Sequence, residues 1–495
     1  MVEGFVAGFG ALLDPYLLLV ILMGTVGGVV IGALPGLSST MATALLVPFT
    51  LTMDPLQAIA LLAAIYCAGT YAGAITAILI NTPGTSAAAA TCIDGYPMAQ
   101  RGEAGRALGM ATVASTVGGI FSVIVLMIAA PSLARLAYQF TAPEYFALAL
   151  FGLSMLASVS AGSAVKNLMA GVLGLLLATV GMDLMTGVER FTFGQAEISE
   201  GISFIPVLIG IFAVSELLIQ SSTLNRVIDR VAMTAVKLPS RDDYKKTWKA
   251  ILRSCGIGTF VGILPAEGAT VASLIGYNEA KRWSKHKEEF GNGAIEGIAG
   301  AEAANNAATG GAMVPTLALG IPGSATTAVI LGAFLVLGIR PGPHLFTEQP
   351  DFVFAIFGAM LIANIMFFFL GLFGAKLFAR LTLIPNTFLW PSVFVLSVVG
   401  AYSLDQSMID VWIMIGAGLL GFVMRRFGFS VVPVAIGLIL GELVETNLKR
   451  ALALFDGDVT QFLNHPIALT LFVLTILGLC GPMIFDHLQR RWNAK

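Results

Sequence analysis

Four short Pro/Gly segments carry the residue types in this sequence that could bind a charged ligand. They lie at Pro35-Gly36, Pro83-Gly84, Pro265 to Gly268 and Pro322-Gly323, and small hydroxyl-bearing residues follow each one. A helix that begins after such a break presents unpaired N–H groups and a positive dipole end, which suits a carboxylate. Serine and threonine hydroxyls add donors without adding formal charge. The four segments together therefore predict a binding site for a small polyanion.

We expect substrate contacts from the Pro and Gly residues and from the hydroxyl side chains that follow them. The candidates are Pro35, Gly36, Ser38, Ser39, Thr40, Pro83, Gly84, Thr85, Ser86, Gly323, Ser324, Thr326 and Thr327. Pro and Gly can instead kink packed helices, with Ser and Thr bonded to the preceding turn. That simpler interpretation is favoured for one isolated break, whereas four breaks in a repeated pattern favour a site.

A second polar group suggests a cation site. Glu302, Asn305, Asn306 and Thr309 are three or four positions apart, so they lie on one face of a helix. Amide, hydroxyl and carbonyl oxygens are ligands that a hard cation such as Na⁺ accepts, and Na⁺ is the one metal that these residues suggest.

Two carboxylates near the expected membrane interior, Glu267 and Glu302, are further candidates for binding Na⁺ or a proton. The alternative, equally weighted, is that both lie nearer the cytoplasmic interface, paired with Lys281, Arg282 or water. By contrast, Asp94 lies in a segment rich in Gly and charged residues, which we interpret as a solvated loop.

The composition requires a membrane protein to position these residues. Of 495 residues, 57% are hydrophobic and 11% are charged, whereas soluble proteins carry about 25% charged residues. The net charge of −2 gives no indication of nucleic acid binding. No CxxC spacing, HExxH motif or nucleotide-binding loop occurs, so we expect no cofactor, only a coupling Na⁺ or H⁺.

Apolar runs of about 20 residues, the length needed to span a bilayer as helix, recur along the chain. Continuous candidates are 58–80, 107–130, 143–160, 166–183, 202–221, 353–376, 387–403, 408–424, 430–446 and 466–485. Pro and Gly interrupt four others, at 16–35, 37–51, 254–277 and 299–338. We therefore predict an all-α polytopic membrane protein with about 12 crossings. Basic residues that end apolar runs, such as Arg425 and Arg426, are expected to be interfacial anchors.

The two halves of the chain resemble each other. GALPGLSSTMA (32–42) matches GILPAEGATVA (262–272) at a shift of 230, and 68–89 matches 307–328 at a shift of 239. A basic connection at 222–253 separates the halves and is expected in the cytoplasm. The predicted organisation is membrane repeat 1 (1–221), a basic cytoplasmic linker (222–253) and membrane repeat 2 (254–495).

Charge placement indicates that the repeats have inverted topology. Segment 254–277 has basic residues on both sides, whereas the flanks of its counterpart, 1–15 and 51–57, contain no Lys or Arg. Opposite charge bias at matched segments is what inverted repeats with re-entrant, Pro/Gly-broken helices predict. Lys449 and Arg450 fit this topology less well, and their side stays open.

The segments around the breaks resemble the large membrane subunit of tripartite tricarboxylate transporters, the TctA-like family. GALPGLSSTMATALLVPFT, NTPGTSAAAATCIDGYPMAQRGEAGRALG and MVPTLALGIPGSATTAVILGAFLVLGIRPGP carry the resemblance, which is densest over 20–115 and 255–345. The family's Pro-Gly motifs correspond to Pro35-Gly36, Pro83-Gly84 and Pro322-Gly323. At Pro265-Ala266 this chain has Ala in place of Gly, which leaves open the backbone geometry of that break.

The resemblance implies a permease in the bacterial inner membrane that works with a small membrane subunit of about four spans and a periplasmic solute-binding protein. Its expected activity is import of a small carboxylate, such as citrate or a related acid, driven by Na⁺ or H⁺. Elevator-like alternating access is the mechanism we expect. The alternatives are a membrane-embedded enzyme acting on a lipid-linked or hydrophobic substrate, and a structural scaffold. The sequence leaves open whether the chain forms a homo-oligomer.

Overall fold

The structure, a computed structural model, describes residues 2–159, 163–183, 185–221, 236–265, 268–374, 377–378, 380 and 384–493. Within these residues the regular secondary structure is helical apart from one antiparallel ribbon, β1 Gly181–Met182 paired with β2 Glu189–Arg190. Six helical segments there are long and apolar enough to cross a membrane: Pro15–Gly32, Pro55–Ile80, Ser86–Ala137, Pro350–Gly374, Thr387–Asp405 and Met408–Arg426. The chain is a multi-pass membrane protein.

The first half of the described chain contains two kinds of helical element, α-helices and short 3-10 or π turns. These are α1 Val2–Ala11, α2 Pro15–Gly32, α3 Ser39–Thr50, α4 Pro55–Ile80, η1 Ser86–Ala88, α5 Ala89–Met98, η2 Ala99–Glu103, α6 Ala104–Ala137, α7 Ala142–Val159, α8 Ala164–Ala178, η3 Ala196–Ile198, α9 Phe204–Ile209, η4 Gly210–Val214 and α10 Ser215–Gln220.

The second half is also composed of α-helices and short 3-10 or π turns. These are α11 Arg241–Ile263, α12 Gly268–Trp283, η6 Lys287–Glu289, α13 Ile295–Leu319, α14 Ala325–Val336, α15 Leu345–Glu348, α16 Pro350–Phe369, η7 Leu370–Gly374, α18 Asn386–Asp405, α19 Met408–Arg426, α20 Val432–Leu454, η8 Val459–Asn464 and α21 Pro466–Asn493.

Each of the ten continuous apolar runs coincides with a helical segment, but two boundaries differ from the prediction. The run 166–183 is too long, because α8 ends at Ala178 and β1 follows. Helix α11 begins at Arg241, well before the predicted 254, because Ser240 and Asp243 form a capping box at its N-terminus. Part of the predicted linker is therefore helical. Its residues 222–235, with Arg226 and Arg230, lie outside the described residues.

Glycines allow α2 to pack closely along α4. A Cβ added at Gly28 would lie 2.8 Å from the carbonyl oxygen of Ile65, and one at Gly32 would lie 2.6 Å from that of Gly69. Both distances are too short for any side chain. The close approach of these two backbones therefore depends on small residues, as is typical of helices packed in membranes.

Helices α11 and α13 pack in the same way. A Cβ at Gly258 would lie 2.3 Å from the carbonyl oxygen of Ala304, and one at Gly262 would lie 2.5 Å from that of Ala308. Helix α6 also lies against α13, where Gly118 approaches the Ala303 carbonyl. Helices α4 and α13 are consequently buried along nearly their whole length, although their sequences include polar residues.

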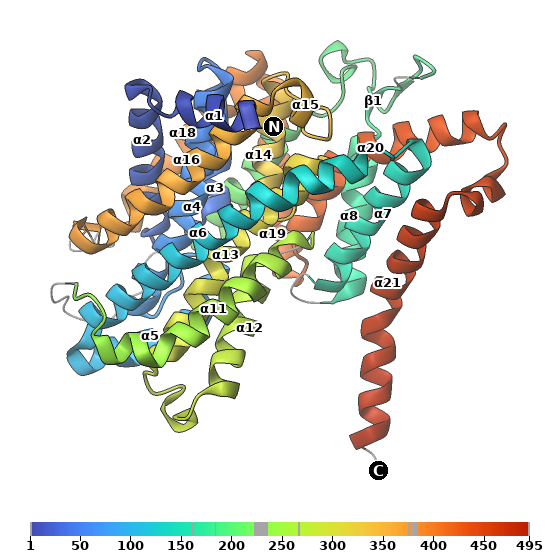
Figure 1. The fold of residues 1–495 in the computed structure, drawn as a ribbon. Helices are drawn as coiled ribbons and strands as arrows, with labels where there is room; N and C mark the ends of the chain where they lie inside the picture. The colour runs from blue at the N-terminus through green and yellow to red at the C-terminus, as the bar shows by residue number, and fades with distance from the viewer. Residues whose placement is uncertain are drawn as a thin grey trace.

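The remaining helices pack outside this centre. Helices α7, α8 and α20 contact one another, with Gly174 of α8 against Val434 and Gly171 against Gly437 of α20. Helix α21 packs along α7 and extends away from the other helices toward the C-terminus (Figure 1). In the same view the N-terminus lies at the upper end of the molecule, and α5, α11 and α12 lie at the lower end.

Candidate functional site

The break at Pro83-Gly84 interrupts the path from α4 to α5. Helix α4 ends at Asn81, which adopts the left-handed conformation (φ 52°) and donates its N–H to the carbonyl of Thr76. After the Pro-Gly pair, the Thr85 hydroxyl accepts the N–H of Ala88 at 3.3 Å and begins the next helical turn, η1. The segment is thus a helix end followed directly by a helix start.

The break at Pro322-Gly323 has the same construction. Helix α13 ends at Gly320, also left-handed (φ 69°), which donates its N–H to the Pro315 carbonyl. Ser324 then caps α14 by accepting the N–H of Thr327 at 3.2 Å, and the Thr327 hydroxyl accepts the N–H of Ser324 at 2.8 Å. This reciprocal cap satisfies backbone donors that would otherwise be unpaired.

The two remaining breaks also precede helices. Gly36 has φ 86°, and the Ser38 hydroxyl accepts the N–H of Met41 at 3.2 Å at the start of α3. The fourth break runs from Pro265 to Gly268, where α12 begins. The candidate cation ligand Glu267 lies outside the described residues.

Residues at or directly after each of the four breaks line one cavity of about 740 Å³. Predicted contact residues that line it are Gly36, Ser38, Ser39, Thr40, Pro83, Gly84, Thr85, Ser86, Ser324 and Thr326. Pro35, Gly323 and Thr327, also predicted, are not among the residues that line it. Their backbone nevertheless shapes the breaks: a Cβ at Gly323, for example, would lie 2.7 Å from the backbone of Ala312.

Hydroxyl groups join the two halves of the chain across this cavity. Thr40 on α3 and Thr326 on α14 are hydrogen-bonded through their Oγ1 atoms at 2.7 Å. Ser86 on η1 is hydrogen-bonded to Thr270 on α12 at 2.8 Å. Each break in one half therefore contacts a break in the other.

The polar face of α13 divides between the cavity and the protein interior. Asn305 lines the cavity and donates through Nδ2 to the Thr70 carbonyl at 3.4 Å. Asn306 donates to the Cys67 carbonyl at 3.2 Å, and the Thr309 hydroxyl donates to the Asn306 carbonyl at 2.7 Å. Neither Asn305 Oδ1 nor Asn306 Oδ1 accepts a hydrogen bond within the described chain. Buried oxygens of this kind are candidate ligands for a cation.

Glu302 lies away from the cavity. It is fully buried and accepts hydrogen bonds from Thr91 on α5 and from Ser115 on α6, the latter at 2.8 Å. Its carboxylate thus connects α13 to both helices. The Glu302 side chain also interacts with that of Asn305, one helical turn along α13, so the predicted polar face includes both residues although their other partners differ.

One ion pair in the cavity was not expected from the sequence. Arg425, predicted to be an interfacial anchor, instead lines the cavity and pairs with Glu216 on α10. Glu216 also accepts a hydrogen bond from Gln220 at 2.8 Å. A carboxylate within the predicted span 202–221 was the signal that could have indicated a buried partner.

A different prediction is wrong at Asp94. The side chain is fully buried rather than in a solvated loop. It accepts the N–H groups of Gly291, Gly293 and Ala294 at 2.8, 2.8 and 2.9 Å. Asp94 therefore holds α5 against the chain that enters α13.

A second cavity, of about 950 Å³, lies at the other ends of the helices that reach the breaks. Helix α14 contributes Ala325 to the first cavity and Leu335 to the second, and α20 contributes Val432 and Glu442 respectively. The second cavity is charged, with ion pairs among Asp183, Arg190, Glu445 and Lys449.

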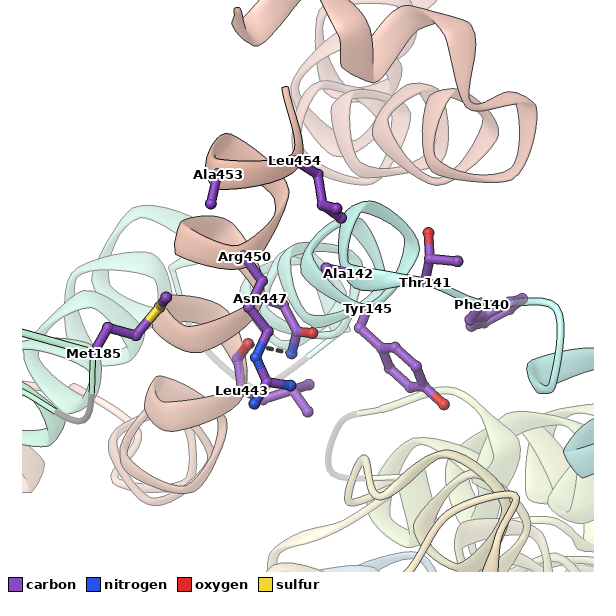
Figure 2. A pocket seen from close by; sticks show the side chains of 10 residues that line it. All are labelled: Phe140, Thr141, Ala142, Tyr145, Met185, Leu443, Asn447, Arg450, Ala453 and Leu454. Atoms are coloured by element: carbon purple, nitrogen blue, oxygen red, sulfur yellow. Dashed lines mark hydrogen bonds between the residues drawn. The ribbon is translucent and has the colours of Figure 1, made fainter. Parts of the chain in front are cut away.

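A third cavity, of about 640 Å³, lies between α7 and α20 (Figure 2). Asn447 and Arg450 of α20 line it together with Tyr145 of α7. It includes no residue of the four breaks, so it has no part in the candidate site.

The arrangement at the breaks suits an anion more than a cation. Helix starts and hydroxyl groups provide donors, and among the described lining residues Glu216 and Arg425 carry opposite charges that balance. A small polyanion can thus be bound mainly by neutral donors. Asn305 lines the same cavity, and its buried amide oxygen, which accepts no hydrogen bond within the described chain, is a candidate ligand for a cation beside it.

Comparison with known proteins identifies similar chains. A family model described as "Tripartite tricarboxylate transporter TctA family" matches residues 18–436. An "uncharacterized 52.8 kDa protein in TAR-I ttuC' 3'region" of Agrobacterium vitis is 40% identical over 477 residues, covering 96% of this chain and 94% of that protein. An "uncharacterized protein in TAR-II ttuC' 3'region" of the same organism is 40% identical over 220 residues, covering 44% of this chain and 91% of that protein. No solved structure is significantly similar.

Proposed function

The chain belongs to the tripartite tricarboxylate transporter TctA family, and on that premise we propose that it is the permease that imports a small carboxylate through the cavity at the four breaks. Family membership makes it a membrane transporter component and not an enzyme. The identity of the acid, the coupling ion and the transport cycle are the parts that we propose.

We propose that the chain consists of two repeats of inverted topology. The pairs Gly28/Ile65 and Gly258/Ala304, which make the same close contact, are related by the shifts of 230 and 239. The shift of 239 also relates the two left-handed helix ends, Asn81 and Gly320. Local geometry thus follows the sequence repeat, and the opposite charge bias of matched segments supports the inversion.

In this proposal the substrate lies between the breaks, and its carboxylates are bound by helix starts and hydroxyls. The single observation that carries the proposal is that residues at or directly after all four breaks, far apart in sequence, line one cavity. Its volume of about 740 Å³ lies within the range of about 300–1,000 Å³ usual for small-molecule sites.

The proposed coupling-ion site lies beside the substrate. Asn305 and Asn306 have unpartnered amide oxygens, and Thr309 is bonded to the Asn306 carbonyl. These neutral ligands suit Na⁺. Glu302 is the proposed carrier if the coupling ion is H⁺, since it is a buried carboxylate with hydroxyl partners. Glu267 stays a candidate from sequence alone.

The proposed cycle is elevator-like alternating access, in which the broken segments move against the remaining helices. The support is that the charged cavity and the cavity at the breaks lie at opposite ends of α14 and α20. A shift of the broken segments, α14 among them, against the remaining helices would transfer the substrate from one cavity to the other. About 12 crossings, in the bacterial inner membrane, complete the proposal.

We also propose two partners: a small membrane subunit of about four spans and a periplasmic solute-binding protein, as a tripartite system requires. The test is uptake of radiolabelled citrate, succinate and benzoate by cells that express all three proteins, with and without a Na⁺ gradient. Gradient-dependent uptake of one or more acids is expected. No uptake of any acid, with the chain inserted and both partners present, would favour a structural scaffold instead.

A further inference from the structure

The ion pair between Arg425 and Glu216 is the one charged contact described within the cavity at the breaks. Arg425 lies in the last turn of α19, and Glu216 lies in the first turn of α10. Their side chains are 27% and 18% exposed, so both are accessible from the cavity yet largely shielded from bulk solvent. A ligand that enters the cavity can therefore reach this pair.

Two neighbouring groups hold the pair in position. A π turn, η4, precedes α10 and leaves the Ile211 carbonyl facing Arg425, whose Nη2 lies 3.5 Å from it. On the other side, Gln220 donates to Glu216 at 2.8 Å. Glu216 therefore keeps a hydrogen-bond partner if its contact with Arg425 is broken. π turns of this kind occur often at functional sites.

We propose that Arg425 is the cation that binds a carboxylate of the transported acid, and that this carboxylate displaces Glu216 from the guanidinium. The inference rests on the proposed function and adds a residue to it. A guanidinium offers the same planar set of N–H donors to any carboxylate. The Glu216 carboxylate therefore uses donors of Arg425 that a substrate carboxylate would also use. The exchange leaves the number of charge-assisted hydrogen bonds unchanged.

This exchange has a consequence for the transport cycle. The Arg425–Glu216 contact joins α19 to α10, and its replacement by a substrate contact removes one of the contacts that hold these helices together. Substrate binding would thereby loosen the side of the cavity formed by these helices. Arg426, the next residue, is exposed and is not among the residues that line the cavity, so it provides a matched control.

The test is binding of radiolabelled citrate, with succinate and benzoate run in parallel, to the purified full chain in lipid nanodiscs. Arg425→Gln and Glu216→Gln both remove the ion pair, but only the first removes the proposed ligand. We expect Arg425→Gln to weaken binding roughly tenfold or more. Glu216→Gln should bind as tightly as wild type or more tightly, because it removes the competing carboxylate. Arg426→Gln should be unchanged.

Equal loss in Arg425→Gln and Glu216→Gln would overturn the proposal, since it would show that the ion pair acts only by holding the helices together. Wild-type affinity in Arg425→Gln would also overturn it. If Arg425→Gln does not insert into the membrane, Arg425→Lys is measured in its place, and we expect its affinity for the acid to be several-fold below wild type. Unchanged affinity in Arg425→Lys would contradict the proposal. A loss of affinity in Glu216→Gln would also contradict it. A wild-type chain that binds and imports none of the acids would overturn the proposed function itself.

Discussion

The segments from α4 to α5 and from α13 to α14 have the same backbone construction and different side chains. Both helices end in a left-handed residue, pass through Pro-Gly and restart at a hydroxyl cap, Thr85 in one and Ser324 in the other. More than four helical turns before the break, however, α4 carries Tyr66 and Cys67 where α13 carries Asn305 and Asn306.

This difference between α4 and α13 indicates that the backbone and the side chains have separate roles in ligand binding. The shared backbone gives each half a helix start that faces the cavity, as two-sided binding of a polyanion requires. The amides occur in α13 alone, where their oxygens are unpartnered in the described structure. We infer that substrate binding uses both halves, whereas cation binding uses the second.

The largest effect is expected from adding a side chain at the shared backbone positions. A Cβ at Gly84 would lie 2.5 Å from the Gly32 carbonyl oxygen, and one at Gly323 would lie 2.7 Å from the backbone of Ala312. Gly84→Ala and Gly323→Ala should each destabilise the folded chain by roughly 1–3 kcal/mol, because backbone must shift. Thermal unfolding of the purified variants measures this.

Gly27→Ala is the control for these two variants, because nothing lies within 4 Å of the added Cβ. If either break tolerates alanine as well as Gly27 does, the two breaks do not share the tight backbone packing described here.

A second substitution tests the difference between the halves. Asn306→Ala removes an amide oxygen proposed as a cation ligand, whereas Cys67→Ala changes the equivalent position in α4. Asn306→Ala should raise the Na⁺ concentration for half-maximal uptake about tenfold, the cost of losing one interaction with a charged group. Cys67→Ala should leave it unchanged. Similar Na⁺ dependence in both variants would show that cation binding does not depend on the second half alone.

A smaller effect is expected from the hydroxyls that join the halves. Thr40→Val removes the hydrogen bond to Thr326 and a donor to the substrate, which should raise the KM for the acid about three- to tenfold. Thr43→Val on the same helix is the control, because its hydroxyl bonds to the Ser39 carbonyl within α3. Equal KM values in the two variants would place Thr40 outside the site.

The smallest effect concerns the charged cavity at the far ends of the helices. Hydrogen bonds from Lys449 and from the N–H of Met185 lower the pKa of Asp183 below its usual range. The stabilisation is therefore complete above the ordinary carboxyl pKa of about 3.9 and is lost as the pH falls below it.

Hydrogen-exchange protection of residues 185–203 should thus be the same at pH 7 and pH 5 and should fall below about pH 4. Lys449→Met should reduce protection already at pH 7. A loop with full protection at low pH in the wild type would show that Asp183 does not anchor it.

Local features of the fold could be predicted from sequence, and tertiary contacts could not. The Pro-Gly breaks and most helix limits follow from residue type and apolar length. The early start of α11 could also have been predicted, because Ser240 and Asp243 have capping-box spacing. The pairing of Arg425 with Glu216 could not have been predicted, since it joins residues that are 209 positions apart in the chain.

The same limit applies within the candidate site. Helical spacing places Glu302 and Asn305 on one face, where their side chains interact, but the neighbouring helices decide what else each side chain contacts. Glu302 is bonded to Thr91 and Ser115, whereas Asn305 lines the cavity. Asp94 is buried because the chain at 291–294 folds over it, which its local sequence does not indicate.

If both halves contribute to one carboxylate site, as we propose, Thr85 and Ser324 must each affect transport, and uptake kinetics of Thr85→Ala, Ser324→Ala and the double variant measure this. Uptake of radiolabelled citrate, succinate and benzoate would be measured with both partner proteins present, and membrane insertion and thermal stability would be matched. We expect each single substitution to raise the KM several-fold and the double variant to raise it by at least the product of the two single effects. Wild-type uptake by the double variant, at equal insertion, would contradict this proposal.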